Sequence, residues 1–280
     1  MNLPRLTHCA VILALSSCAA APTLPPVEPY SAAELGTVRY KAVLAAGDSS
    51  LPVFDNAVAA VADRLRASER MAGITRLSAT PALIEQSGVR SASLDHILDA
   101  ISGLKPDVGQ GCLVFVTSHG APYRGLYLSS AGEMLSPHSL DRALVQGCGN
   151  APTVVVASGC FSGTFAQPPM ARTNRVILTA ARADRVSFGC GAGFTYTVYD
   201  RCLLGSLDKG GTWQDAAGAI KACVEQEERR QGVTPSLPQT WFGSAVRGLP
   251  MPGIKHQKDM PLAGLADPLS LLQDASPARP

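Results

Sequence analysis

Two side chains able to do proton-transfer and nucleophilic chemistry, His119 and Cys160, each follow an apolar run of the chain. The first run reads Leu-Val-Phe-Val-Thr-Ser from residue 113, and the second reads Thr-Val-Val-Val-Ala-Ser from residue 153. Such uninterrupted runs are typical of strands buried on both faces, as in parallel sheets covered by helices. Ligands of those sheets collect outside the carboxyl ends of the strands. If the two strands are neighbours, the imidazole and the thiol meet in one cleft.

A thiolate nucleophile needs a proton-transfer partner and hydrogen-bond donors for the oxyanion that forms when it attacks a carbonyl. Cys160 lies between Gly159 and Phe161-Ser-Gly163, and these small neighbours expose the sulfur and let backbone N–H groups approach a substrate. The N–H groups of Gly120 and Cys160 would together form a two-donor oxyanion hole. The pattern predicts a cysteine-nucleophile hydrolase that uses neither a metal nor another cofactor.

Each of these residues also has a simpler interpretation when it is taken alone. A single cysteine in a secreted chain is more often a structural thiol or half of a disulfide than a nucleophile. A histidine at the end of an apolar run is more often a core residue. The two residues together, each beside a glycine and separated by one helical pattern, favour catalysis.

The amino terminus predicts export from the cytoplasm. Residues 9–15 are apolar and follow Arg5, and this stretch is too short to span a bilayer but fits the core of a signal peptide over residues 1–17. Leu15-Ser-Ser-Cys18 resembles a bacterial lipobox, which implies lipidation of Cys18 and a protein anchored in the cell envelope, facing the periplasm. Because Ala19 is not aspartate, the resemblance implies the outer membrane. Cleavage near Ala20, which would release a soluble protein, is the alternative.

Composition indicates one compact domain. Of 280 residues, 46% are hydrophobic and 16% are charged, and the net charge is +2. We expect an Ala- and Pro-rich tether at 18–36, a single domain at 37–248, and a disordered tail at 249–280. The basic residues are dispersed, which argues against a nucleic-acid partner.

Strands alternate with helical patterns along the domain, which predicts an α/β fold with a mostly parallel central sheet flanked by helices. A hairpin or flap follows His119. The other strands are expected at 38–46, 74–78, 175–181 and 238–242, and the helices at 54–71, 94–103, 136–147, 194–207 and 212–230.

Six cysteines lie within the expected domain, and some should pair in an oxidising periplasm. Cys112 and Cys148 each precede one of the two apolar runs, so a bridge between them at the amino-terminal edge of the sheet is plausible. Cys202 and Cys223 lie on consecutive helical patterns and could also pair. The remaining two, Cys160 and Cys190, fall on the cleft side. Sequence alone leaves the connectivity open.

Three segments resemble the caspase-haemoglobinase clan, and in particular the legumain-type cysteine peptidases with their bacterial lipoprotein members. They are Ser118-His119-Gly120, Ser158-Gly-Cys160-Phe-Ser-Gly163, and residues 179–190. Phe194-Thr-Tyr196 and Pro238-Gln239 are also similar to the bacterial branch, and the resemblance covers roughly residues 38–242. It implies a caspase-like three-layer sandwich and a peptidase that acts on peptides or proteins.

The resemblance assigns a role to four residues. Cys160 matches the nucleophile, and Gly120 matches the oxyanion-hole glycine. His119 matches the histidine that protonates the leaving amine and polarises the scissile carbonyl. Ser187 matches a residue in the wall of the pocket that sets specificity.

Two departures from the legumain pattern affect that pocket. Ser158 stands where legumain has Glu, and Asp55-Asn56 stands where legumain has an Arg-His pair. An acidic Asp55, with Asp48 or Asp184, could favour a basic residue on the amino side of the cleaved bond. Asp55 could equally be an ordinary acidic residue at the start of a helix.

Two other functions are compatible with the same residues. A transamidase or ligase would use the same His119/Cys160 dyad and pass the acyl group to an amine. A catalytically silent envelope lipoprotein would use the fold only for binding or structure, and a bridge between Cys160 and Cys190 would favour it.

Overall fold

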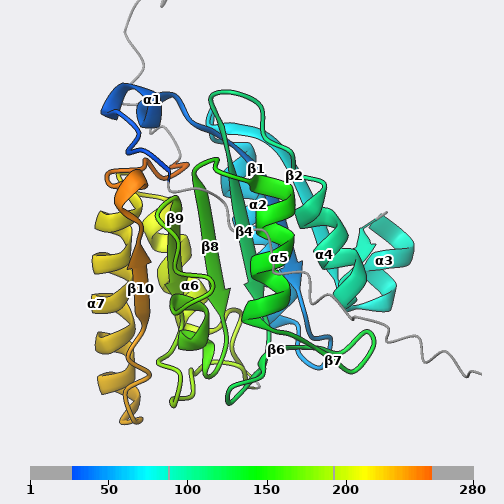
Figure 1. The fold of residues 1–280 in the computed structure, drawn as a ribbon. Coiled ribbons are helices and arrows are strands. Elements are labelled where there is room, and N and C mark those ends of the chain that lie inside the picture. Colours follow the sequence, from blue (N-terminus) through cyan, green and yellow to red (C-terminus); the bar gives the residue numbers. More distant parts are fainter. Residues whose placement is uncertain (1–26, 88, 192, 254–280) are drawn as a thin grey trace, which may run out of the picture.

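A seven-stranded sheet forms the centre of the molecule, with strand order β10-β9-β8-β4-β1-β2-β3 (Figure 1). The computed structural model describes residues 27–87, 89–191 and 193–253. The strands are β1 (Arg39–Ala46), β2 (Met71–Ser78), β3 (Arg90–Ser91), β4 (Gln110–Thr117), β8 (Thr153–Ser158), β9 (Arg175–Thr179) and β10 (Gln239–Phe242). Neighbouring strands are parallel except for β10, which runs antiparallel to β9.

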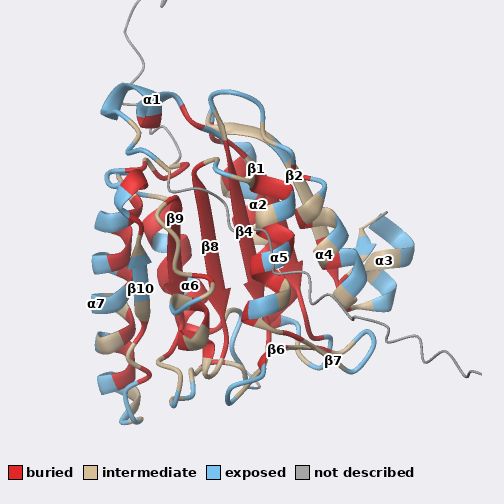
Figure 2. Ribbon diagram, in the orientation of Figure 1, coloured by how far each residue is buried: buried red, intermediate tan, exposed pale blue. Residues whose placement is uncertain are grey.

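Helices cover both faces of this sheet, and each face has its own hydrophobic core. Helices α2 (Val53–Arg66), α6 (Val198–Leu207) and α7 (Trp213–Gln231) pack on one face, and α4 (Leu94–Ser102) and α5 (Pro137–Cys148) pack on the other. Figure 2 shows a sheet that is buried between helices whose outer sides are exposed. The predicted α/β architecture, with a mostly parallel sheet flanked by helices, is confirmed.

Strand β4 shows why the apolar run behaves as a fully buried strand. Leu113 and Phe115 belong to the core under α2, α6 and α7, whereas Val114 and Val116 belong to the core under α4 and α5. Because side chains alternate between the two faces of a strand, a sheet covered on both sides buries every position.

Hydroxyl side chains cap the first turns of two helices. At the start of α5 the Ser136 hydroxyl accepts the Ser139 N–H at 3.1 Å, and Pro137 is the first helical residue. At the start of α7 the Thr212 hydroxyl accepts the Asp215 N–H at 3.1 Å. These side chains satisfy N–H groups that have no partner within the helix.

The boundary between α2 and β2 was predicted wrongly. The sequence indicated a helix over 54–71 and a strand from 74, but α2 ends at Arg66 and β2 already begins at Met71. Met71 pairs with Tyr40 and Gly73 with Lys41 of β1. Pairing with β1 outweighs helical propensity in this stretch.

Two further differences concern helices near the edges of the fold. The helix expected from residue 194 begins at Val198, where the Thr197 hydroxyl accepts the Asp200 N–H at 3.0 Å. Helix α3 (Pro81–Ser87) was not predicted, and it has no buried residue. A helix without a buried stripe lacks the periodic apolar signal on which such a prediction depends.

Both ends of the described chain pack more closely than the sequence indicated. Within the expected tether, α1 (Ala32–Thr37) buries Leu35. Within the expected disordered tail, Leu249 and Met251 are buried, and the Tyr40 hydroxyl donates to the Pro250 carbonyl at 2.6 Å. The expected signal peptide, Cys18 and residues 254–280 lie outside the described residues.

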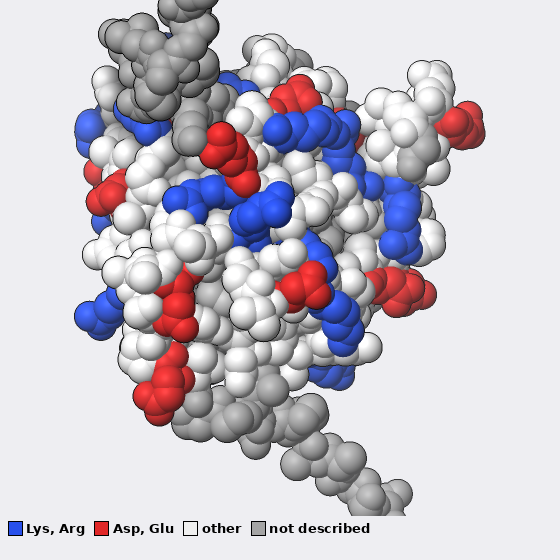
Figure 3. Space-filling view, turned by 90° about the horizontal axis from the view of Figure 1, so that it is seen from above, with Lys and Arg blue, Asp and Glu red and all other residues white. Residues whose placement is uncertain are grey.

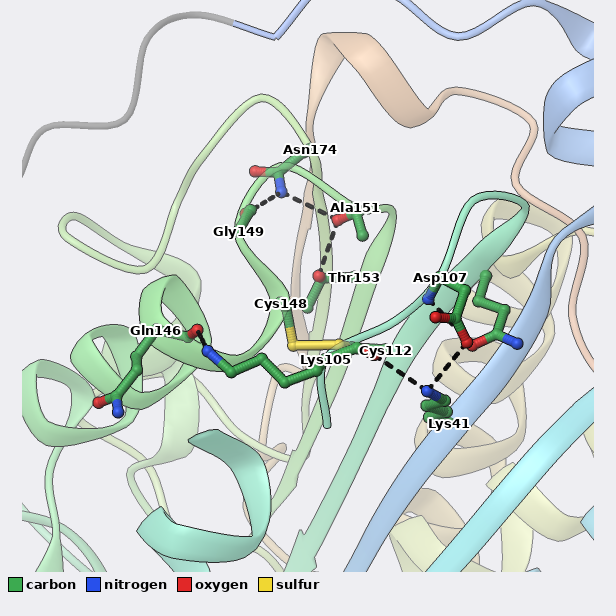
Figure 4. Close-up of a disulfide and its surroundings, with 11 residues drawn as sticks. Lys41, Lys105, Asp107, Cys112, Gln146, Cys148, Gly149, Ala151, Thr153 and Asn174 are labelled. Atoms are coloured by element: carbon green, nitrogen blue, oxygen red, sulfur yellow. Dashed lines mark hydrogen bonds and ion pairs between the residues drawn. A yellow bond between two sulfur atoms is a disulfide. The ribbon is translucent and has the colours of Figure 1, made fainter. Parts of the chain in front are cut away.

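The described part of the chain holds two disulfides, Cys112–Cys148 and Cys202–Cys223. The first joins β4 to the end of α5 at the pole where the parallel strands begin, and Lys105 binds the Gln146 carbonyl at 2.6 Å beside it (Figure 4). The second joins α6 to α7. Cys160 and Cys190 are free.

Positive and negative side chains are interspersed on the face in Figure 3, which looks down on the pole that carries α1. Among the described residues, no helix is long and apolar enough to cross a membrane.

A buried ion-pair network ties α5 to the sheet. Arg175 of β9 donates to Asp141 at 2.7 Å, and Arg172 donates to the same carboxylate at 2.8 Å. Burial opposes ionisation of Asp141, but the hydrogen bonds and charges of the two guanidinium groups hold its pKa below the usual value. Burial lowers the pKa of Arg175 to about 10, so both partners are ionised at neutral pH.

We expect Asp141→Ala to destabilise the fold by about 3–5 kcal/mol, because it leaves the buried Arg175 guanidinium without its carboxylate. Urea unfolding followed by circular dichroism measures this difference. Asp63→Asn is the control, since the ion pair of Asp63 with Arg66 is exposed. An Asp141→Ala midpoint equal to that of the control would contradict the assigned role.

Candidate active site

The parallel register of β4 and β8 brings the two candidate catalytic residues to one edge of the sheet. Thr117 and Ser158, the last residues of these strands, are register partners. His119 and Cys160 each lie two residues further along. Both are half-buried, at the pole opposite the Cys112–Cys148 disulfide.

The backbone of Gly120 lies directly against the backbone of Cys160. A Cβ atom added to Gly120 would stand 1.9 Å from the Cys160 carbonyl oxygen and 3.2 Å from its nitrogen. On the other side, a Cβ added to Gly159 would stand 2.6 Å from the Ser118 carbonyl oxygen. Only glycine fits at such separations, so the two turns that carry the imidazole and the thiol are in contact.

The sulfur of Cys160 is met by the segment that follows β9. The Ser187 N–H donates to Cys160 Sγ at 3.3 Å, and the Ser187 hydroxyl lies 3.7 Å from the same sulfur. An N–H donor at this place solvates a thiolate. Ser187, which the resemblance places in the pocket wall, therefore contacts the candidate nucleophile itself.

The turn after Cys160 is strained and firmly held. Phe161 has φ of 57°, which costs a non-glycine residue about 1 kcal/mol. Its N–H donates to the Arg185 carbonyl at 2.7 Å. The Ser162 hydroxyl donates to the Gly159 carbonyl at 2.7 Å and accepts the Ala181 N–H at 3.2 Å. The end of β9 thus fixes the shape of the turn that presents the thiol.

His119 is held by packing and by its backbone. The ring of Phe54, from the start of α2, meets its imidazole edge to face, with centroids 5.2 Å apart. The Tyr127 N–H, from β6 (Gly125–Leu128), donates to the His119 carbonyl at 2.8 Å. Within residues 27–87, 89–191 and 193–253, no side chain hydrogen-bonds to the imidazole. Sequence reasoning missed Phe54 because its helical spacing already marked it as a core residue.

The expected hairpin after His119 is a small antiparallel sheet of β5 (Gly120–Ala121), β6 and β7 (Glu133–Leu135). Leu126, Leu128 and Leu135 are completely buried in the core under α4 and α5. This burial anchors the small sheet beside the strand ends.

Asp55 does not stand free in the site. Its two carboxylate oxygens accept the Ser78 hydroxyl at 2.7 Å and the Thr80 hydroxyl at 2.6 Å. These residues lie at the end of β2, on the side of β1 away from β4. Asp48 is likewise occupied, since it accepts the Ser50 N–H at 2.7 Å.

The other two expected pocket residues differ in exposure. Asp184 is exposed and forms an ion pair with Arg182, whose hydrogen bonds hold the pKa of Asp184 below the usual value. Ser158 is buried, with 1% of its surface exposed. The structure brings Ser187 to Cys160 and leaves Asp184 on the surface of the 182–187 segment. The Ser158 hydroxyl faces the buried carboxyl of Asp200, so the structure does not place it in a substrate pocket.

A carboxyl group that sequence reasoning missed lies behind the strand ends. Asp200, in the first turn of α6, is 0% exposed, and Thr117 donates to its Oδ2 at 2.7 Å. A signal was present in the sequence, because Asp200 interrupts the otherwise apolar face of that helix.

The cavity with the volume of a small-molecule site does not lie at the candidate dyad. A cavity of about 510 Å³ lies at the opposite pole, lined by residues including Tyr30, Val38 and Cys148. Among the described residues, no cluster of His, Cys, Asp and Glu could hold a metal ion.

The sequence profile of the Peptidase C13 family, the legumain family, matches residues 107–248. That span holds both strand ends, the small sheet and the 182–187 segment. The chain belongs to the Peptidase C13 family. This family match supports a cysteine peptidase of the legumain type. No curated protein matches this chain.

Two solved structures share the fold. Caspase-1 from Spodoptera frugiperda is 10% identical, with a TM-score of 0.50, and the match covers 74% of this chain and 86% of that one. The structure of pro-sf-caspase-1 is 11% identical, with a TM-score of 0.52 and coverage of 73% and 91%. These likenesses confirm the caspase-like fold.

We expect Gly120→Ala to slow peptide hydrolysis strongly, because the added methyl must push the His119 and Cys160 turns apart. A displacement of about 1 Å at a catalytic group costs roughly a hundredfold in rate. Gly218→Ala on α7 is the control, since a Cβ there meets nothing within 4 Å. A Gly120→Ala protein with the turnover of the control would show that the close approach is dispensable.

Proposed function

We propose that this chain is a cysteine endopeptidase in which Cys160 is the nucleophile and His119 transfers the proton to the leaving group. The observation that carries the proposal is the contact between the Gly120 and Cys160 backbones, which places imidazole, thiol and two N–H groups at one strand edge. Cys160 is a free thiol, which adds support, because a disulfide with Cys190 would have favoured a catalytically silent protein.

The proposed reaction begins with attack of the Cys160 thiolate sulfur on the scissile carbonyl carbon. The carbonyl electron pair moves to oxygen, and the N–H groups of Gly120 and Cys160 bind the resulting oxyanion. The C–N bond then breaks as His119 protonates the leaving amine, which leaves a thioester on Cys160. Water hydrolyses the thioester and restores the thiol.

The environment of the sulfur suits this division of roles. Cys160 Sγ makes hydrogen-bond contacts with Ser187, while the imidazole of His119 packs against Phe54. The histidine is therefore free to act at the leaving amine. This is the role that the resemblance to legumain-type peptidases implies.

We further propose a preference for a basic residue on the amino side of the cleaved bond. Asp184 lies in the same short segment as Ser187, which contacts the nucleophile. Its exposed ion pair with Arg182 contributes little to stability and can be exchanged for a cationic substrate side chain. The carboxylate of Asp55 is already occupied by two hydroxyls and is the weaker candidate.

The chain is further proposed to be a lipoprotein of the bacterial cell envelope, anchored through Cys18 and facing the periplasm, with the outer membrane as its site. Supporting this, the described chain begins at the pole of α1, opposite the strand ends of the dyad (Figure 1). An anchor at that end would direct the active edge away from the membrane.

We expect Cys160→Ala and His119→Ala to abolish hydrolysis of fluorogenic peptides, and Cys190→Ala to retain it. Cys190 is the matched control because it is the other free, half-buried cysteine of the described residues. A peptide electrophile, read by mass spectrometry, should modify the Cys160 peptide alone. Full hydrolysis by Cys160→Ala would contradict the proposal.

The same electrophile series tests specificity. Among probes with Arg, Lys, Asn or Asp next to the reactive group, those with Arg and Lys should label Cys160 fastest, and Asp184→Asn should reduce that advantage. Equal labelling by all four probes would contradict the basic preference.

Adding an amine acceptor to the peptide assay separates hydrolysis from transamidation, because only a transferase gives the amide product.

A further inference from the structure

One buried carboxyl group behind the strand ends has no part in the reaction described above. Asp200 Oδ2 accepts the Thr117 hydroxyl, and Asp200 Oδ1 is buried without a hydrogen-bond partner among the described residues. A buried polar atom left unpaired costs about 1–3 kcal/mol. An apolar side chain at this position would avoid that cost, so the carboxyl group serves a purpose other than filling the core.

The surroundings of Asp200 come from three elements. Burial raises the pKa of its carboxyl above the usual value. Three nearby hydroxyls lower this pKa in part: those of Ser158 from β8, Thr117 from β4 and Thr197 from the start of α6. Thr117 and Ser158 are the last register pair of their strands. Asp200 therefore sits behind the pair from which both catalytic turns depart.

Thr117 is the last residue of β4, and His119 follows it after Ser118 alone. With Thr117 bound to Asp200, the end of β4 is fixed against the first turn of α6. The main chain leaves that fixed point and reaches His119 two residues later.

The imidazole depends on this fixed point because little else orients it. Histidine bases are commonly oriented by a hydrogen bond from a third group. Here the His119 imidazole has a ring contact with Phe54 and no side-chain hydrogen bond within the described residues. Its place relative to Cys160 is thus set by the backbone and by packing.

We propose that Asp200 is a positioning residue that fixes the end of β4 through Thr117 and so sets where His119 stands relative to Cys160. This inference rests on the proposed peptidase function. It assigns to Asp200 no contact with substrate.

Thr117→Val tests the proposal because it removes the hydroxyl and keeps the shape of the side chain. We expect its kcat to fall roughly ten- to a hundredfold, as for a small misplacement of a catalytic group, with KM unchanged. Thr117→Ser, which keeps the hydroxyl, should retain kcat. Rates are expressed per Cys160 labelled to completion by the peptide electrophile, because unfolded protein has no substrate-binding site for this probe.

Variants of Asp200 complete a double-mutant cycle with Thr117→Val. Asp200→Asn keeps an oxygen that accepts the Thr117 hydroxyl and should retain most of kcat, whereas Asp200→Ala should lose as much as Thr117→Val. The double variant Asp200→Ala/Thr117→Val should lose no more than either single variant, because one interaction is removed in all three.

Two results would overturn the proposal. One is a folded Thr117→Val protein with the kcat of the unchanged chain. The other is a rise in KM confined to substrates with Arg or Lys when Asp200 is changed to Asn, since that would make Asp200 a substrate-binding residue. Failure of the peptidase function itself is a different result, namely hydrolysis that survives Cys160→Ala.

Discussion

The close approach of two backbone turns, at Gly120 and at Cys160, is the constraint on which the rest of the site depends. A Cβ on Gly120 would stand 1.9 Å from the Cys160 carbonyl oxygen, so any side chain there must separate the turns. The parallel register of β4 and β8 produces this approach, because Thr117 and Ser158 end their strands side by side. Chemistry at this edge therefore follows from strand pairing and from one residue without a side chain.

The surrounding elements keep these turns in place from several sides. Ser162 links the nucleophile turn to the end of β9, and Phe54 of α2 packs against the imidazole. From the sheet face under α6, Asp200 holds Thr117. At the far pole the Cys112–Cys148 disulfide joins the start of β4 to the end of α5, and the buried Arg175–Asp141 ion pair joins the start of β9 to the same helix. The site is thus set on rigid elements, as catalytic geometry requires.

Much of the fold could be predicted from the sequence because the buried strands carry a strong local signal. The runs before His119 and Cys160 indicated buried strands of a parallel sheet, and resemblance indicated the caspase-like fold. The boundary at Met71 and the packing of Leu249 depend on partners distant in the chain, so local patterns could not reveal them. The surroundings of the Asp55 and Asp200 side chains could not be predicted for the same reason, since their hydrogen bonds join elements that are distant in the chain.

The most direct test of the account is the identity of the residue that carries the acyl group during turnover. Rapid acid quenching with an activated peptide ester, followed by mass spectrometry, should find the acyl mass on the peptide that contains Cys160. Its appearance should slow sharply in Gly120→Ala and should not depend on Cys190. Steady hydrolysis with no acyl group on Cys160, or an acyl group on another residue, would contradict the assignment of Cys160 as the nucleophile.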